Sequence, residues 1–192
     1  MLNLLFYEDC VELALPQPTA LDLASLTWLR YNPRKNINRW GCSITSLDGG
    51  DSGVPDLDSV LEYNTLNGTN YTEKDFKVPT KHAEPFQDFL AVWPVGRSHY
   101  LKFTAGGFFP WHRDGDPHTF RLIYTIKNCS SNHLIWLEDD KILNFQDRCW
   151  YYINTKKKHA LFSLNEENVL AVFNVVYDST THRLLNASMK IR

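Results

Sequence analysis

The sequence predicts a mainly β protein with flanking helices, of the α+β class. Short segments rich in β-branched and aromatic residues follow one another closely in the second half, separated by polar, turn-like pieces. Helix-like periodicity is confined to the first half. Many short strands at close spacing are typical of a β-sandwich or barrel of the jelly-roll or cupin kind, whose mouth is a common ligand site. The predicted strands of this half are Thr119–Lys127, His133–Leu137, Ile142–Phe145, Cys149–Ile153 and Val169–Tyr177.

Length and composition favour one domain. The chain has 192 residues, of which 43% are hydrophobic, and this is enough for one core of ordinary size. We expect residues 1–96 to supply strands and supporting helices, residues 97–178 the barrel, and residues 179–192 a C-terminal extension. A net charge of -2 gives no basic surface for nucleic acid. With no membrane-length apolar run and no basic signal-peptide region, we expect a cytoplasmic protein with a small-molecule or peptide partner. The sequence does not indicate its oligomeric state.

The first half is expected to combine strand and helix. Leu4–Leu15 resembles a strand that ends at Pro16. Thr19 can cap a short helix that continues to Trp28. Pro55–Tyr63 is predicted as a second helix, stopped by Asn67 and Gly68. Glu84–Trp93 is predicted as a third, whose aromatic residues at helical spacing indicate a core face.

Polar and glycine-rich segments between residues 31 and 53 interrupt this half. Loops of this composition beside a barrel often contact the substrate, although most polar loops are simply solvated. The candidates for substrate contact are Arg39, Trp40, Ser43 and Thr45.

The run W-H-R-D carries the sharpest chemical signal. His112 and Asp114 are two residues apart, so on a strand both side chains point to one side. His159 follows 45 residues after Asp114. Two histidines and a carboxylate on one face of an octahedral ion leave the opposite face open, as in non-haem Fe(II) oxygenases. A lone H-x-D also arises by chance, and the surrounding strands are what favour a metal site.

From Arg97 onward the residues match a longer pattern. The chain reads R-S-H-Y-L-K-F-T-A-G-G-F-F-P-W-H-R-D, then R-L-I-Y-T-I-K-N, then D-R-C-W-Y-Y-I-N-T-K-K-K-H. Residues 97–178 thereby resemble the aspartyl/asparaginyl β-hydroxylase-like family of Fe(II)- and 2-oxoglutarate-dependent oxygenases, which includes free-proline hydroxylases. The resemblance implies a double-stranded β-helix, with Fe(II) held by His112, Asp114 and His159 and 2-oxoglutarate as cosubstrate.

Two departures concern the cosubstrate. The family carries an arginine nine or ten residues after the distal histidine, for the far carboxylate of 2-oxoglutarate, but Asn168 and Val169 stand here. Neither gives the bidentate pair that a guanidinium gives. The family's T-N at the end of the second strand is replaced by Lys127-Asn128. Lys127 lies on the same side of its predicted strand as Arg121. We expect it to replace the arginine that binds the far carboxylate of 2-oxoglutarate, as a lysine on this strand does in the JmjC branch of the superfamily. The alternative is that Lys127 is solvated at the end of the strand.

Arg121 and Tyr100 complete the expected cosubstrate and substrate contacts. Arg121 would hold an anionic group, and the Tyr100 hydroxyl would donate to the cosubstrate. The predicted function is hydroxylation of an amino acid or of an amino-acid side chain in a peptide or protein. A cupin-like binding or structural protein without 2-oxoglutarate turnover is the main alternative, and a metal enzyme that does not use 2-oxoglutarate is the third.

Overall fold

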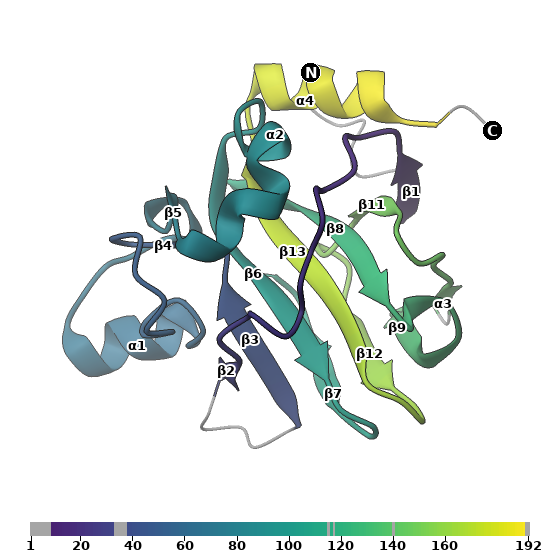
Figure 1. The fold of residues 1–192 in the computed structure, drawn as a ribbon, viewed down its shortest axis with the longest axis horizontal. Helices are drawn as coiled ribbons and strands as arrows, with labels where there is room; N and C mark the ends of the chain where they lie inside the picture. Colours follow the sequence, from purple (N-terminus) through teal and green to yellow (C-terminus); the bar gives the residue numbers. More distant parts are fainter. Residues whose placement is uncertain (1–8, 33–37, 115, 117, 140, 191–192) are drawn as a thin grey trace.

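The computed structural model describes residues 9–32, 38–114, 116, 118–139 and 141–190. Within them a larger sheet has seven strands in the order β1-β11-β8-β13-β6-β3-β2, with every pair antiparallel. Its strands β13, β8 and β6 form the centre of the molecule (Figure 1). Their bounds are β1 Cys10–Leu13, β2 Leu29–Arg30, β3 Arg39–Ser43, β6 Val95–Phe103, β8 Thr119–Lys127, β11 Trp150–Ile153 and β13 Asn168–Val176.

A smaller antiparallel sheet has the order β10-β9-β12-β7 among the described residues. Its strands are β7 Phe108–His112, β9 His133–Leu137, β10 Ile142–Leu143 and β12 His159–Ser163. From β6 to β13 the chain passes repeatedly between the two sheets: β6, β8, β11 and β13 belong to the larger, and β7, β9, β10 and β12 to the smaller. This alternation is the topology of an eight-stranded jelly roll, so the predicted fold class is confirmed.

The remaining elements are short. Strands β4 (Thr45–Ser46) and β5 (Val78–Pro79) pair with each other. The helices are α1 Val60–Asn67, η3 Glu73–Asp75, η4 Lys81–Phe86, α2 Gln87–Leu90, α3 Cys129–Asn132 and α4 Ser179–Ser188. Helices α2 and α4 lie at the same end of the molecule (Figure 1). No helix in the described part of the chain is long and apolar enough to cross a membrane.

The larger sheet is covered on both faces, and this produces two cores. On one face, Phe86, Phe89 and Leu185 from the helices pack against Trp150 and Phe173 of the sheet. The Phe89 and Trp150 rings are stacked with centroids 4.7 Å apart, a favourable offset for aromatic pairs. Aliphatic and aromatic residues pack between the two sheets on the other face. This second core forms the base on which the site is built.

The helices of the first half differ from the sequence-based expectation. Residues 19–28, all described, form turns and no helix. The helix expected at Pro55–Tyr63 begins later, because Ser59 provides its N-cap by accepting from the Glu62 amide. It ends, as predicted, before Gly68, whose φ of 64° suits glycine. The helix expected at Glu84–Trp93 is split into η4 and the single turn α2, with Pro85, which lacks an amide donor, inside η4.

The strands of the second half match more closely. Strands β8 and β9 have the predicted bounds, while β10 and β11 are shorter than predicted. Strand β12 and helix α4 were not predicted. The segment that leads to His159 is dominated by three lysines, which hide the start of β12.

Candidate metal centre and its cavity

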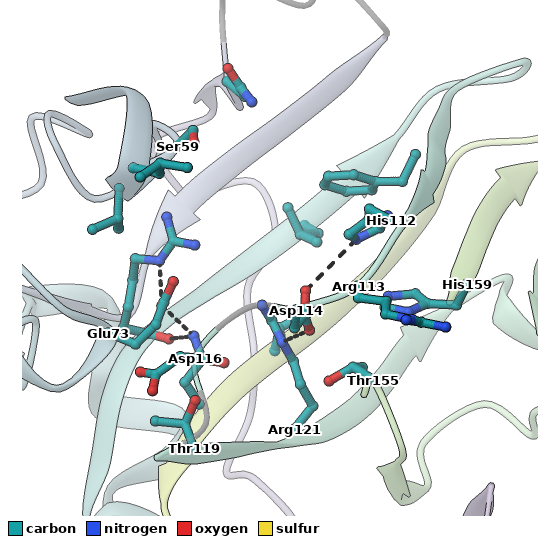
Figure 2. Close-up of a pocket in the computed structure, with 18 of the residues that line it drawn as sticks. Ser59, Glu73, His112, Arg113, Asp114, Asp116, Thr119, Arg121, Thr155 and His159 are labelled. Carbon is teal, nitrogen blue, oxygen red and sulfur yellow. Dashed lines mark hydrogen bonds and ion pairs between the residues drawn. The ribbon is translucent and has the colours of Figure 1, made fainter. Parts of the chain in front are cut away.

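The structure brings His112, Asp114 and His159 together. His112 is the last residue of β7 and pairs with His159, the first residue of the adjacent β12. The two imidazole centroids are 4.3 Å apart. Asp114 lies just past the end of β7, and one ligand atom from each residue lies within 4.8 Å of the others. Figure 2 shows the three side chains around one end of the cavity. The group can therefore offer three donors to one ion.

Both imidazoles are oriented by backbone carbonyls. Nδ1 of His112 lies 2.7 Å from the Pro110 oxygen, and Nδ1 of His159 lies 2.9 Å from the Lys157 oxygen. Carbonyls only accept, so these contacts assign the proton to Nδ1 and leave each Nε2 with a free lone pair. Metal-binding histidines are commonly oriented by such bonds at the other nitrogen. In both histidines the carbonyl belongs to the residue two positions earlier.

Asp114 is fixed at three points. Its amide donates to the Thr155 oxygen at 3.1 Å. Its Oδ2 lies 2.6 Å from Nε of Arg121, and its Oδ1 lies 3.7 Å from Nε2 of His112. Burial by itself raises the pKa of Asp114, but the positive charge of Arg121, followed by smaller effects of the two imidazoles and of Thr155, outweighs it and the pKa is lowered. The carboxylate is therefore ionised and directed at both partners (Figure 2).

Burial also affects His159. It lowers the pKa of the imidazole, and the nearby carboxylate of Asp114 opposes this only in part. The ring is therefore neutral near pH 7, which is the form that binds metal.

A cavity of about 750 Å³ opens beside these three residues. Its base is aliphatic, and residues of both sheets form it. The first residues of α1 and the segment that precedes η3 also line the cavity. The aliphatic residues lining the cavity are Leu101, Ile123, Ile135, Ile153, Leu161, Leu170 and Val172.

A polar row crosses the larger sheet in the wall of this cavity. Arg121 on β8 lies opposite Asn174 on β13. Asn174 donates through Nδ2 to Glu73 at 2.7 Å and to the Arg97 oxygen at 2.8 Å. Arg97 donates through Nε to the same Glu73 oxygen at 2.8 Å and through Nη1 to the Asp58 oxygen at 2.7 Å. Burial lowers the pKa of Arg97, but the charge of Glu73 outweighs it and raises the pKa.

Of the other sequence-predicted residues, Arg121 alone lines the cavity. Lys127 is 50% exposed at the end of β8, where its Nζ lies 3.5 Å from Glu167. This corrects the expectation that it points inward. Lys127 has the same strand parity as Arg121, but it is the last residue of β8, where the pairing with β13 shifts register, and its side chain lies at the surface. Tyr100 donates to the His82 oxygen within the helix-covered core. It lies on the opposite face of β6 from Arg97 and Leu101, which line the cavity.

The candidate substrate residues on β3 and β4 lie outside the cavity. The Arg39 guanidinium is buried over the Phe109 ring, behind the cavity wall. Trp40 stacks with Arg30, with the guanidinium 4.8 Å from the ring centroid. The Ser43 hydroxyl donates to Asp56 at 3.3 Å, and the Thr45 hydroxyl donates to the Gly96 oxygen at 2.8 Å. Trp40, Ser43 and Thr45 thus have structural partners, which corrects their assignment as substrate contacts.

Sequence reasoning missed the polar residues Glu73, Arg97, Asn174 and Lys156, all of which line the cavity. Asn174 lies on the same side of its strand as Leu170 and Val172. An amide within this apolar run could therefore have indicated a polar residue in the cavity. No pattern indicated Glu73, because it is brought in by a short 3₁₀ helix far from the barrel in sequence.

The donor set fits a divalent metal, since a carboxylate and two imidazoles with free Nε2 atoms suit Fe(II). A 2-oxo diacid also requires a fixed cation, because an unpaired buried carboxylate is costly. The aliphatic base of the cavity does not supply this cation. The residues therefore fit a metal ion better than they fit 2-oxoglutarate bound as the resembling family binds it, with an arginine on its far carboxylate.

No protein-family model and no curated protein sequence matches the chain. Several solved structures are similar in shape. A 2OG-Fe(II) oxygenase family oxidoreductase from Burkholderia pseudomallei is 13% identical with a TM-score of 0.48, over 88% of this chain and 84% of that one. A cupin domain from Bordetella pertussis is 13% identical with a TM-score of 0.36, over 42% of this chain and 81% of that one. The polyketide cyclase RemF from Streptomyces resistomycificus is 13% identical with a TM-score of 0.34, over 41% of this chain and 53% of that one. These likenesses assign no activity to this chain.

Proposed function

We propose that the protein is a non-haem Fe(II) oxygenase that uses 2-oxoglutarate to hydroxylate an amino acid or an amino-acid side chain of a peptide. The observation that carries the proposal is the meeting of His112, Asp114 and His159 at the edge of a cavity, with donor atoms within 4.8 Å. The resemblance of residues 97–178 to Fe(II) oxygenases supports the same reaction class. A bound Fe(II) ion would supply oxygen activation coupled to decarboxylation of the 2-oxo acid.

The protein's own residues prepare this chemistry. The Pro110 and Lys157 carbonyls keep both Nε2 atoms available, and Arg121 keeps Asp114 ionised and in place. The aliphatic side chains below the triad exclude water from the reacting atoms. The polar row in the cavity wall gives a substrate groups with which to form hydrogen bonds.

A second candidate is a cupin-like binding protein without 2-oxoglutarate turnover. The observation that favours it is that every arginine and lysine in the described cavity lining already has an oxygen partner. Arg97, Arg113 and Arg121 pair with Glu73, Glu138 and Asp114, and Lys156 donates to the Asp116 carbonyl. Under this alternative a metal binds and 2-oxoglutarate is not consumed.

One experiment separates the two candidates. Fe(II) is titrated anaerobically into the wild type, His112→Ala and the control His182→Ala, which lies on α4 away from the cavity. We expect one metal per chain in the wild type and the control, and a loss of at least about tenfold in affinity in His112→Ala. Oxygen, ascorbate and 2-oxoglutarate are then added, and succinate is measured. Succinate from the wild type supports the oxygenase. Metal binding without succinate supports the binding protein, and equal metal affinity in all three chains contradicts both.

A further inference from the structure

Arg39 on β3 is a buried cation beside the metal centre. Its side chain is 2% exposed, and it is among the largest fully buried side chains of the described chain. The guanidinium carbon lies 3.2 Å from the centroid of the Phe109 ring and 5.3 Å from that of Tyr31. Contacts of this kind offset part of the cost of burying a cation.

Two of the three nitrogens of the guanidinium lack the oxygen partners that a buried charge requires. Its Nε and Nη1 atoms have no hydrogen-bond partner, and no ion pair to an acidic group is found for it in the described part of the chain. Burial lowers the pKa of Arg39 to about 9, which still leaves the group protonated at pH 7. A buried charge without a partner destabilises the folded protein. Such an exception requires an explanation, and a bound ligand that supplies an oxygen is one.

The location of Arg39 relates this missing partner to the cavity. Tyr31 and Phe109, the two rings that contact the guanidinium, both line the cavity. The Phe109 ring in turn contacts the His112 ring, with centroids 5.4 Å apart. Arg39 is therefore separated from a candidate metal ligand by one aromatic ring.

Other polar atoms near Tyr31 also lack partners. Oδ1 of Asn32 is buried without a hydrogen bond, and Asn32 lines the cavity. Both ring nitrogens of His99, whose centroid is 5.0 Å from that of Tyr31, are buried without one. Arg39, Asn32 and His99 therefore place unpartnered polar atoms around Tyr31.

We propose that Arg39 holds the distal carboxylate of the 2-oxo acid cosubstrate, which reaches it between the rings of Tyr31 and Phe109. This inference rests on the proposed function and identifies a cation beside the cavity that no described acidic side chain pairs with. An arginine on a strand N-terminal to the barrel would then bind the distal carboxylate, which the resembling family binds with an arginine after the distal histidine. The carboxylate would satisfy the free N–H groups of the guanidinium in a charge-assisted pair.

The test compares two ligands that differ only in the distal carboxylate. Binding of 2-oxoglutarate and of 2-oxopentanoate, which has the same five-carbon chain, is measured by calorimetry with the Mn(II)-loaded protein. The chains are the wild type, Arg39→Gln, Arg39→Lys and the control Lys127→Gln. We expect the wild type and Lys127→Gln to prefer 2-oxoglutarate, and Arg39→Gln to lose at least about 30-fold of this preference. The affinity for 2-oxopentanoate should remain, and Arg39→Lys should fall between.

The outcomes are distinguishable. If the wild type binds neither 2-oxo acid, the proposed function fails, and the inference fails with it. If the wild type prefers 2-oxoglutarate and Arg39→Gln keeps that preference, the inference alone is overturned and Arg39 has a structural role. Should the Arg39 variants not fold, a crystal structure of the wild type with Mn(II) and 2-oxoglutarate decides. A carboxylate within hydrogen-bonding distance of Arg39 supports the assignment, and a carboxylate elsewhere overturns it.

Discussion

The two carboxylate oxygens of Asp114 face different partners. Oδ1 is directed at Nε2 of His112, and Oδ2 contacts Nε of Arg121. A metal ligand held in this way loses little conformational freedom when the ion binds, because its non-ligating oxygen is already fixed. The Arg121 cation also disfavours a second positive charge nearby. Positioning and repulsion therefore act in opposite directions on metal affinity.

We expect positioning to dominate. Arg121→Met should lower Mn(II) affinity about tenfold or more, in line with the loss of other outer contacts to metal ligands. Arg121→Lys keeps the positive charge but lacks the planar guanidinium, so it should recover only part of the lost affinity. Affinity is measured by anaerobic titration, with Lys127→Met as the control on the same strand. A rise in affinity for Arg121→Met would show that repulsion dominates and would contradict the positioning role.

His99 predicts a pH dependence of stability. Burial, followed by the charges of Arg97 and Arg121, lowers the pKa of His99 well below its usual value. The unfolded chain therefore binds a proton that the folded chain does not, and stability falls as pH drops through the unfolded pKa near 6.5. Between pH 7.5 and 5.5 the loss from this group should be on the order of 1 kcal/mol. His99→Leu should remove that part.

The measurement is urea unfolding of the metal-free protein at both pH values. Asp56 acts with the opposite sign, because burial raises its pKa to about 6 and stability from this group grows as pH falls through that value. His159 has the same sign as His99. The difference between the wild type and His99→Leu isolates His99. An identical pH dependence in the two proteins would show that His99 is not held neutral.

At the scale of elements, the sequence predicted the strands better than the direction of their side chains. Strands β8 and β9 have the predicted bounds because β-branched and aromatic runs end there in polar residues. Strand β6 is buried along both faces, so its sequence shows no alternation of apolar and polar residues. The sequence therefore could not show that Leu101 faces the cavity and Tyr100 the other core. The pairing of β7 with β12 places His112 beside His159. In the sequence, only the H-x-D pattern and a distal histidine indicated that these residues meet.

Contacts from outside the barrel were beyond the sequence pattern. Helix η3 supplies Glu73 to the polar row, and its contact with β6 depends on a glycine. A Cβ at Gly96 would overlap the carbonyl oxygen of Glu73. No local propensity reports such a close approach between segments more than twenty residues apart.

Gly96→Ala should therefore destabilise the protein by about 1–3 kcal/mol, the usual cost of overpacking. The added methyl group would displace η3 from β6 and weaken the contact between Arg97 and Glu73. Unfolding in urea measures the effect. Gly50→Ala is the control, because the nearest atom to its Cβ belongs to the exposed side chain of Asp48, which can move. Its effect should stay within about 0.5 kcal/mol. Equal stability of both variants would contradict the close approach.

At the scale of the whole molecule, the segment before the barrel belongs to both the core and the site. Strands β1, β2 and β3 extend the larger sheet at its two edges. Phe86, Phe89 and Trp93 pack against that sheet, and Tyr31 and Asp58 line the cavity. Burial of three aromatic side chains stabilises by roughly 5–9 kcal/mol. That amount is comparable to the entire stability of a typical domain.

A chain that begins at Arg97 should therefore neither fold nor bind metal, even though it contains His112, Asp114 and His159. It would expose the edge of β6 and the face of the larger sheet that the helices cover, and it would lose Arg39 and Glu73. Limited proteolysis of the Mn(II)-loaded protein should accordingly yield no stable fragment that starts near this residue. The shortened chain is examined by circular dichroism and Mn(II) titration, beside full-length protein refolded in the same way. A folded, metal-binding fragment would show that the barrel is an independent unit and that the N-terminal segment only shapes the cavity.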